Sequence, residues 1–572
     1  MVFSMSKEIS RNEHIKDASN FLRGTIAEGL RENLTGSIVE DDQQLVKFHG
    51  MYLQDDRDLR PERGRKKLEK AFAFMLRVRI TGGVLTSQQW LALDRIARTY
   101  ANGSMRLTTR QTVQLHGVIK SNLRATLKEI DAQLLNTIAA CGDVNRNVMC
   151  NPNPYQSRAH AAAQAISDHL TPRTGAYREI WLDGEKIAGA AETGETVEPI
   201  YGRTYLPRKF KVAVAVPPVN DIDVYANDLG FIAILDPAGE VAGWNVVAGG
   251  GMGMTHGEPD TYPRTADMLG FCTTDRAIAV AEAVVTTQRD WGDRANRKHA
   301  RLKYTIEDRG LDNFRAEVER RAGIAFQKEK PFTFTSMGDR YGWVESGDGR
   351  AHLTVFIQNG RVQDGAAGNN QMTALRKIAE LDVGDFRITP NQNLILANIP
   401  VSHQDTVNRI AQQAGLLAPW SGLRRNSMAC VALPTCGLAL AESERYLPTL
   451  IDALDGSLAR HGLSADDIVI RMTGCPNGCA RPYLAEIGLV GKGPGRYNLY
   501  LGAAFDGSRL SKLYAEDLDH DGIVAALDPA FAAYARDRKT GERFGDFTIR
   551  AGYVARTTNG RDFHANVRVH AS

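Results

Sequence analysis

The feature that most constrains the fold of this chain is a short unit that occurs twice. The run Gly103-Ser-Met-Arg-Leu-Thr-Thr-Arg-Gln-Thr-Val-Gln-Leu-His-Gly117 shares its glycine, arginine, threonine and glutamine positions with Gly384-Asp-Phe-Arg-Ile-Thr-Pro-Asn-Gln-Asn-Leu-Ile-Leu396. Each copy follows a segment with helical spacing of apolar residues, 91–100 in the first and 374–381 in the second. An internal duplication implies two related halves, and a site shared by both could lie between them.

The segment upstream of the first copy alternates between apolar and other residues. From Ala71 to Ile80 the pattern predicts a strand with Arg77 and Arg79 on the face opposite the apolar side chains. Thr86 or Ser87 can cap the helix that follows, because a hydroxyl can accept a hydrogen bond from a free N–H of the first turn. The sequence therefore predicts strand, helix and strand in this order.

The first copy of the repeated unit carries a row of basic and polar residues. If it stays extended, six of its side chains share one face. They are Arg106, Thr108, Arg110, Thr112, Gln114 and His116. Such a face is commonly solvated, although two arginines and a histidine on one strand could also bind an anion. The second copy has Asn391 and Ile395 in place of Arg110 and Gln114, so only the first keeps the full basic face.

A second pair of basic residues leads into a valine-rich strand. Apolar residues alternate to one face from Phe210 to Val216, which places Lys209 and Lys211 together on the other face. The pattern is compatible with a functional anion site and with a pair of surface lysines. Both interpretations stay open at the level of the residues alone.

Four of the seven cysteines lie in one stretch with the spacing C-x5-C, then 38 residues, then C-x3-C. They are Cys430, Cys436, Cys475 and Cys479. Pro434, Pro476 and Gly478 keep the two loops out of regular helix or strand. Iron–sulfur clusters need thiolates that converge from short loops, whereas structural zinc usually shows closer cysteine pairs. The spacing favours a four-iron, four-sulfur cluster over a structural zinc site or four unrelated buried thiols.

Bulk properties exclude several classes of function. A formal net charge of +3 argues against a general nucleic-acid binder, which needs a basic face over a whole domain. The first residues lack the apolar core of a signal peptide, and no apolar run is long enough for a transmembrane helix. We therefore expect a cytoplasmic protein that does not bind membranes. Cys141, Cys150 and Cys272 have no paired spacing and are expected to be buried free thiols.

A glycine-rich run, Gly249-Gly-Gly-Met-Gly253, invites a nucleotide-binding interpretation. It fails the G-x-G-x-x-G pattern because the third glycine position falls on Met254 or His256, and no clear helix follows it. A tight turn, or close approach of the backbone to a flat cofactor, is the better prediction. No P-loop or Rossmann fingerprint occurs elsewhere in the sequence.

The cysteine spacing, the duplicated unit, Asn145-Arg-Asn-Val and Leu206-Pro-Arg-Lys-Phe-Lys together resemble the sirohaem-dependent sulfite and nitrite reductases. The resemblance covers nearly the whole chain, and the cysteine loops are its most specific part. It implies an internally duplicated α+β (mixed α/β) fold. Each of two pseudo-symmetric halves would have a ferredoxin-like half-domain and a larger α/β cofactor-binding domain.

This resemblance also divides the chain into five parts. The division is an N-terminal arm that could dock a partner (1–70), a first ferredoxin-like half-domain (71–140), a sirohaem and substrate domain (141–340), a second ferredoxin-like half-domain (341–405), and an iron–sulfur cluster and sirohaem domain (406–572). The arm contains a charge-dense segment, 55–67, for which a solvated face is the default interpretation.

The resemblance also implies that the protein binds two cofactors. A 4Fe-4S cluster would be held by the four cysteines and coupled to sirohaem, with Cys479 as the thiolate that bridges to the haem iron. Sirohaem carries many carboxylates, so Arg106, Arg110 and His116 are candidates to hold its periphery. Asn477, in the second cysteine loop, is a further candidate for cofactor binding.

The resemblance also implies a reaction, which is the six-electron reduction of sulfite to sulfide. Arg77, Arg146, Lys209 and Lys211 would surround the substrate anion on the open face of the haem as the catalytic residues. Cationic side chains hold such an anion, and their pull grows as charge develops on its oxygens. The nitrite-reducing branch of the family tends to have asparagine where Lys211 stands, so lysine here favours sulfite.

Electrons are expected from a separate NADPH-oxidising flavoprotein in a hetero-oligomer, because the chain itself lacks nucleotide motifs. The nearest alternative is a ferredoxin-dependent sulfite or nitrite reductase. An alternative from a different class is a non-catalytic iron–sulfur electron carrier or a zinc-stabilised scaffold.

Overall fold

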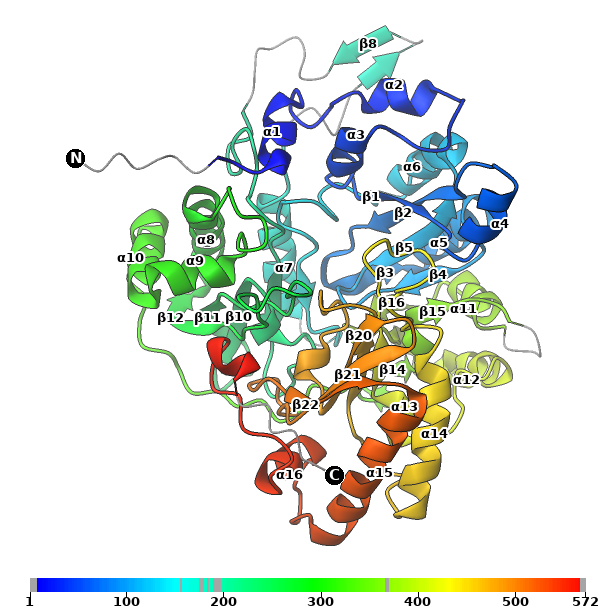
Figure 1. Ribbon diagram of the computed structural model, residues 1–572, viewed down its shortest axis with the longest axis vertical. Helices are drawn as coiled ribbons and strands as arrows, with labels where there is room; N and C mark the ends of the chain where they lie inside the picture. Colours follow the sequence, from blue (N-terminus) through cyan, green and yellow to red (C-terminus); the bar gives the residue numbers. More distant parts are fainter. Residues whose placement is uncertain are drawn as a thin grey trace.

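The computed structural model describes residues 8–154, 157–173, 180–182, 185–188, 197–365 and 370–565. Within these residues the chain forms four five-stranded sheets and one two-stranded sheet of β7 (Ile180–Leu182) and β8 (Glu185–Ala188). Figure 1 shows one α/β unit in green on the left and the other in orange below, with the ferredoxin-like units in blue and yellow-green on the right. None of the described helices is long and apolar enough to cross a membrane.

The two ferredoxin-like units have the same strand order. The first sheet runs β1 (Met51–Asp55), β2 (Phe72–Val78), β5 (Val113–Val118), β4 (Met105–Leu107) and β15 (Arg361–Val362). The second runs β13 (Gly342–Glu345), β14 (Arg350–Val355), β17 (Leu394–Pro400), β16 (Asp385–Ile388) and β3 (Val84–Thr86). Each sheet therefore ends on a short strand supplied by the other half of the chain.

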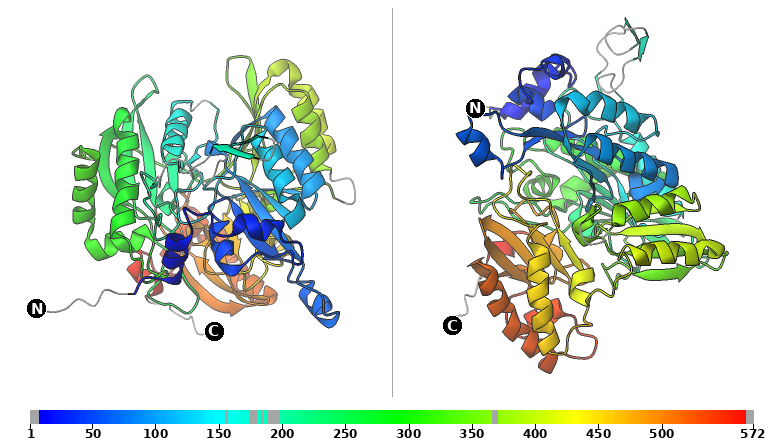
Figure 2. Two further views of the ribbon diagram at one scale, coloured as in Figure 1. Left: turned by 90° about the horizontal axis from the view of Figure 1, so that it is seen from above. Right: turned by 90° about the vertical axis from the view of Figure 1, so that its right-hand side faces the viewer.

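These two units share one hydrophobic core, which contains buried residues from Ile38 to Leu416. Helices α5 (Ser87–Tyr100) and α11 (Gln371–Glu380) lie side by side over it (Figure 2), and Trp90 stacks on Phe386 with 4.6 Å between ring centroids. Thr86 caps α5 as predicted, in a reciprocal pair with Gln89. Helices α6 (Leu123–Asp131) and α12 (Gln404–Gln413) extend the same layer.

The two α/β units are also copies of each other. One sheet runs β6 (Met149–Cys150), β9 (Val212–Ala215), β10 (Leu229–Leu235), β11 (Val241–Ala248) and β12 (Asp267–Thr273). The other runs β18 (Ser427–Ala429), β19 (Ile470–Thr473), β20 (Ile487–Gly493), β21 (Arg496–Leu501) and β22 (Lys512–Leu518). In both, the first three strands are parallel and the last two are antiparallel to their neighbours. The predicted duplicated, mixed α/β fold is confirmed.

Helices cover the α/β sheets. The first unit carries α7 (Ser157–His169), α8 (Ala277–Trp291), α9 (Leu302–Arg309) and α10 (Leu311–Ala322). The second carries α13 (Gly422–Arg425), α14 (Leu447–Arg460), α15 (His520–Asp537) and α16 (Phe544–Arg550). Before the first sheet the chain forms α1 (Arg11–Ala18), α2 (Ile26–Arg31) and α3 (Glu40–Leu45), and α4 (Arg60–Arg65) lies between β1 and β2.

The prediction of one extended run over 103–117 is wrong. The segment is a hairpin of β4 and β5, closed by a turn in which the Thr108 N–H donates to the Thr112 carbonyl at 2.9 Å. Gln111 takes a positive φ of 55° in this turn, which reverses the chain. The six polar side chains therefore do not line one strand, and Arg106 lies opposite Gln114 across the hairpin.

Candidate functional site

Two neighbouring parallel strands carry the cysteine loops to one edge of the second α/β sheet. Ala429 at the end of β18 lies opposite Met472 in β19, and Cys430 and Cys475 follow these strands directly. Because the carboxyl ends of parallel strands meet at the same edge, the two loops converge there. The Gly474 N–H donates to the Cys430 Sγ at 3.3 Å, which joins one loop to the other.

The four thiols influence one another. The pKa of Cys430 is raised to about 12 and that of Cys475 to about 11, mainly by burial and next by the neighbouring Cys479. The pKa of Cys436 is raised for the same two reasons. Cys475 is buried, Cys430 and Cys436 are half-buried, and Cys479 is exposed. Bound iron would reverse these shifts, because a coordinating thiol is deprotonated.

Among the described residues, no three histidine, cysteine, aspartate or glutamate side chains are grouped so that they could hold a single metal ion. Zinc draws its thiolates onto one centre, whereas the irons of a cluster bind thiolates at separate corners. The preference for a cluster over zinc therefore rests on the spacing of the four cysteines.

The first duplicated hairpin contacts both cysteine loops. The Thr109 hydroxyl donates to the Cys479 backbone oxygen at 3.0 Å, and Arg481 Nη1 donates to the Thr109 oxygen at 2.9 Å. Arg106 Nη2 donates to the Ala429 oxygen, one residue before the first cysteine, at 2.7 Å. The candidate site thus lies between the two halves of the chain.

The structure places Arg106, Arg110 and His116 inside the protein. Arg106 Nε lies 3.2 Å from Glu444, and Arg110 Nη1 donates to the Asn227 side chain at 2.8 Å. Neither ring nitrogen of His116 has a hydrogen-bond partner among the described residues, and burial lowers its pKa well below the ordinary value. A buried imidazole without a partner is unusual, and an acidic cofactor beside it would supply one.

Arg77 and Arg146 reach the site from different elements of the first half. Arg77 lies on β2, and its Nη1 donates to the Cys141 thiol at 3.1 Å. Arg146 precedes β6, and its guanidinium donates to the Gly142 oxygen at 3.1 Å. Cys141 is buried and unpaired with another cysteine, as predicted.

Lys209 and Lys211 lie just before β9 and are half-buried. The pKa of each lysine lies well below 10.5, mainly because of burial. The next largest cause is the charge of Arg208 for Lys209 and the charge of Arg110 for Lys211. Arg146 and Cys479 also act on the pKa of Lys209, in opposite directions. The charges of Arg146 in the first half and of Cys479 in the second cysteine loop thus both act on Lys209.

Two residues that the sequence analysis did not select, Tyr52 and Lys47, lie near Arg146. Tyr52 makes side-chain hydrogen bonds with Cys141 and with Arg146. The Lys47 Nζ lies 5.7 Å from the centroid of the Tyr52 ring, and burial lowers its pKa to about 8. The position of Tyr52 follows from the pairing of β1 with β2, which cannot be predicted from a local sequence pattern.

The glycine-rich run lies against the second cysteine loop. The Met254 N–H donates to the Pro476 oxygen at 3.1 Å, and a Cβ on Gly253 would stand 3.3 Å from the Asn477 oxygen. Asn477 in turn places its amide nitrogen 3.5 Å from the Cys475 sulfur. The backbone of the run thus packs on this loop, while its predicted close approach to a flat cofactor stays a prediction.

Comparison with known proteins identifies the same family that the cysteine loops indicate. The family model of the nitrite/sulfite reductase ferredoxin-like half domain matches residues 66–133 and 344–414, and that of the nitrite and sulphite reductase 4Fe-4S domain matches 161–326. A sulfite reductase (NADPH) hemoprotein beta-component from Methylobacterium sp. (strain 4-46) is 66% identical over 560 residues, which are 97% of this chain and 93% of the relative. The chain belongs to the nitrite and sulfite reductase family. The family resemblance predicted from the sequence is thereby confirmed.

More distant members of the nitrite and sulfite reductase family also match nearly the whole chain. A protein of the same name from Anoxybacillus flavithermus is 56% identical over 558 residues, 96% of this chain and 97% of the relative. The solved structure of the Mycobacterium tuberculosis NirA protein is similar with a TM-score of 0.77 and 26% identity, covering 95% of this chain and 97% of that one. The match to the 4Fe-4S domain ends before the four cysteines. Their assignment as cluster ligands therefore rests on the cysteine loops themselves.

Proposed function

We propose that this chain reduces sulfite to sulfide, using a sirohaem joined by a cysteine thiolate to a 4Fe-4S cluster. The observation that carries the proposal is that the first duplicated hairpin binds both cysteine loops, because Thr109 donates to the Cys479 oxygen and Arg106 donates to the Ala429 oxygen. Similarity to hemoprotein beta-components named sulfite reductase, at 63–66% identity, supports the same activity.

The cofactor residues have definite places in this proposal. Cys430, Cys436, Cys475 and Cys479 would hold the cluster, and Cys479 would also bind the haem iron. The exposure of Cys479 and the hydrogen bond that fixes its backbone leave its thiol available for a second bond. His116, Arg106 and Arg110 face the acidic groups of sirohaem, and Asn477 orients the second cysteine loop through Cys475. When bound, the two cofactors would pass to sulfite the six electrons that the donor supplies.

The anion and its protons are handled by side chains of the first half. Sulfite gives up three oxygens as water, so each oxygen must gain two protons. Arg77 and Arg146 hold the charged oxygens, because a guanidinium keeps its proton at any working pH. Lys209 and Lys211 supply protons, since their lowered pKa values bring them closer to neutral pH, where proton transfer is efficient.

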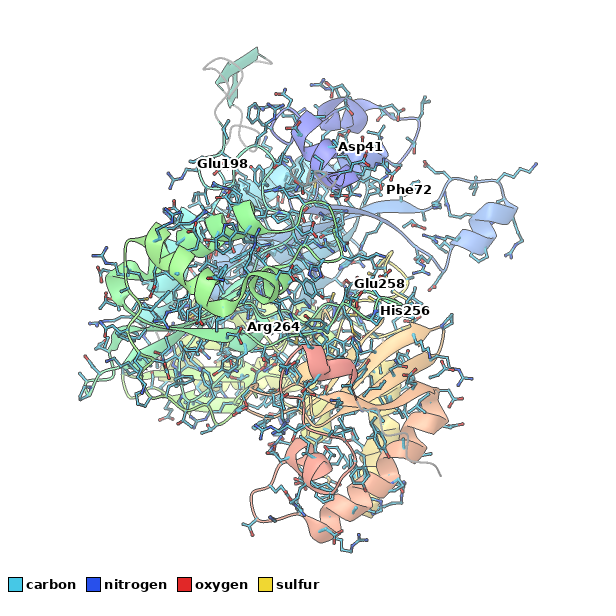
Figure 3. All side chains as sticks on the ribbon, turned by 60° about the vertical axis from the view of Figure 1, so that its left-hand side comes forward. Asp41, Phe72, Glu198, His256, Glu258 and Arg264 are labelled. Atoms are coloured by element: carbon cyan, nitrogen blue, oxygen red, sulfur yellow. The ribbon has the colours of Figure 1, made fainter. Side chains whose placement is uncertain are left out.

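The donor is proposed to be a separate NADPH-oxidising flavoprotein that forms a hetero-oligomer with this chain in the cytoplasm. Part of the predicted N-terminal arm supports a docking role. Arg57 Nη1 donates to the Cys436 and Ala439 oxygens at 3.3 and 2.8 Å, while α4 projects away from the molecule on an arm that starts beside Phe72 (Figure 3). A partner on this arm would therefore sit next to the first cysteine loop.

Turnover with defined donors tests the proposal. We expect the purified chain to reduce sulfite with an NADPH-oxidising flavoprotein, and to use nitrite less well because lysine occupies position 211. Turnover with reduced ferredoxin but not with the flavoprotein would favour the ferredoxin-dependent alternative. Absence of sulfite reduction with every donor, in a chain that contains both cofactors, would overturn it.

A further inference from the structure

Lys303 on α9 is a fully buried lysine that the proposed reaction does not use. Its Nζ donates to the backbone oxygens of Gly251 at 3.2 Å, Gly253 at 2.7 Å, and Tyr262. It also lies 4.8 Å from the centroid of the Tyr304 ring. An ammonium group has three donors and here meets three carbonyl acceptors, so its hydrogen-bonding capacity is fully used.

The nearest acidic group is already engaged by another residue. Arg301 binds the Asp228 carboxylate with Nη2 at 2.9 Å and Nε at 3.2 Å. Burial is the main cause that lowers the pKa of Lys303, and Arg301 lowers it further. Lys303 Nζ thus contacts three backbone oxygens and an aromatic face, which points to a role in holding these carbonyls in place.

The carbonyls of Gly251 and Gly253 belong to the glycine-rich loop, residues 249–254. At its start the loop is tied to its own unit, because the Gly250 N–H donates to the Asn227 oxygen at 3.0 Å. A Cβ on Gly250 would stand 2.1 Å from the Tyr225 oxygen, so only glycine fits there. Lys303 is thus the side chain that fixes the far end of the loop.

That far end packs on the second cysteine loop, residues 475–479. The Met254 N–H donates to the Pro476 oxygen at 3.1 Å. A Cβ on Gly478 would stand 2.9 Å from the Met252 oxygen, so the two backbones are in direct contact. Backbone packing of this kind transmits a displacement of one loop directly to the other.

We propose that Lys303 is a positioning residue that clamps the glycine-rich loop onto the second cysteine loop, and so holds Cys475 and Cys479 in place for the cluster. Figure 3 labels His256 and Glu258, which follow the glycine-rich loop, where the green unit meets the orange one. The inference rests on the proposed function, because it takes these two cysteines to be cluster ligands.

The test compares Lys303→Met, which removes all three donors, with Lys303→Arg, which keeps donors and charge. Lys298→Met is the matched control, because Lys298 is exposed and pairs with Glu258 at the surface. Iron and acid-labile sulfide are measured first. Loss of cluster absorbance is then followed with an iron chelator, alongside the thermal unfolding temperature.

We expect Lys303→Met to lose its cluster about tenfold faster than the unmodified chain, since the buried hydrogen bonds that hold the Gly251 and Gly253 oxygens are removed. Lys298→Met should match the unmodified chain, and Lys303→Arg should lie between. At a temperature well below unfolding, Lys303→Met should still lose its cluster faster than Lys298→Met, whereas a purely structural role would accelerate cluster loss only as the chain unfolds.

Release of the cluster from Lys303→Met at the unmodified rate would overturn the inference and leave the proposed function intact. An unmodified chain that contains no iron would instead overturn the proposed function. If Lys303→Met does not fold, the Gly253→Ala variant tests the same contact between the two loops. The added Cβ would contact only the Asn477 backbone. That variant should release its cluster about threefold faster by forcing the loops apart, and an unchanged rate would overturn the inference.

Discussion

The Thr109 hydroxyl donates a hydrogen bond to the backbone oxygen of Cys479, with 3.0 Å between the two oxygens. Thr109 lies in the turn of the first duplicated hairpin, and Cys479 is the last cysteine of the second half. The contact shows how the duplication builds a site. One half supplies cations and the hairpin, the other supplies thiols, and the site lies where the two meet.

Cys479→Ser tests the proposed bridge. We expect the variant to lose the coupling between sirohaem and cluster, together with sulfite reduction, because serine does not provide a soft thiolate for iron. Visible and electron paramagnetic resonance spectra measure the coupling. Cys272→Ser is the control, since this buried thiol lies on β12 away from the cysteine loops. A Cys479→Ser variant with a normal haem spectrum and normal activity would refute the bridging assignment.

Lys209→Ala and Lys211→Ala test proton delivery. Each should lower kcat for sulfite about a hundredfold or more, the usual worth of a general acid, while cofactor content stays close to that of the unmodified chain. The alkaline limb of the kcat profile should also shift, because the lysines lose protons at a pH below 10.5. If both variants instead lack sirohaem, the two lysines are structural.

His116 gives a prediction about stability and pH. Its pKa in the folded chain lies well below 6.5, so below pH 6.5 the unfolded chain binds the extra proton and stability is lost as pH falls. The free energy of unfolding of the cofactor-free chain should fall by up to about 1.4 kcal/mol per pH unit from this residue. His116→Gln should flatten the curve. An identical slope in the variant would show that His116 does not titrate on unfolding.

The projecting helix α4 gives a prediction about the electron donor. Arg65 and Lys67 are exposed at its end, and reversing both charges should raise the KM for the flavoprotein about tenfold by weakening encounter. A small reductant such as reduced methyl viologen should drive the same variant at the unmodified rate. Lys377→Glu on α11 is the control, since this residue is exposed and lies in the other half. Equal effects on both reductants would exclude a docking role for α4.

Several features of this molecule could be predicted from the sequence because they depend on local chemistry. The Thr86 cap, the alternation in β2 and the cysteine loops are set by neighbouring residues. The hairpin around Gln111 was missed because a positive φ at glutamine has no sequence signal. Tyr52 was missed because its place beside Arg146 depends on strand pairing.

Exchange of β3 and β15 between the ferredoxin-like units was also not predicted. Both strands are short, at three and two residues, and they gain their partners from the distant half of the chain. A pattern of period two needs more residues than this to be visible. The exchange explains why the two predicted half-domains form a single hydrophobic core.

The visible spectrum of the purified chain, read together with its metal content, tests the central claim most directly. The account predicts iron and acid-labile sulfide together with a haem-type absorption band that shifts when sulfite is added. Zinc without iron, or iron without a haem-type band, would contradict it.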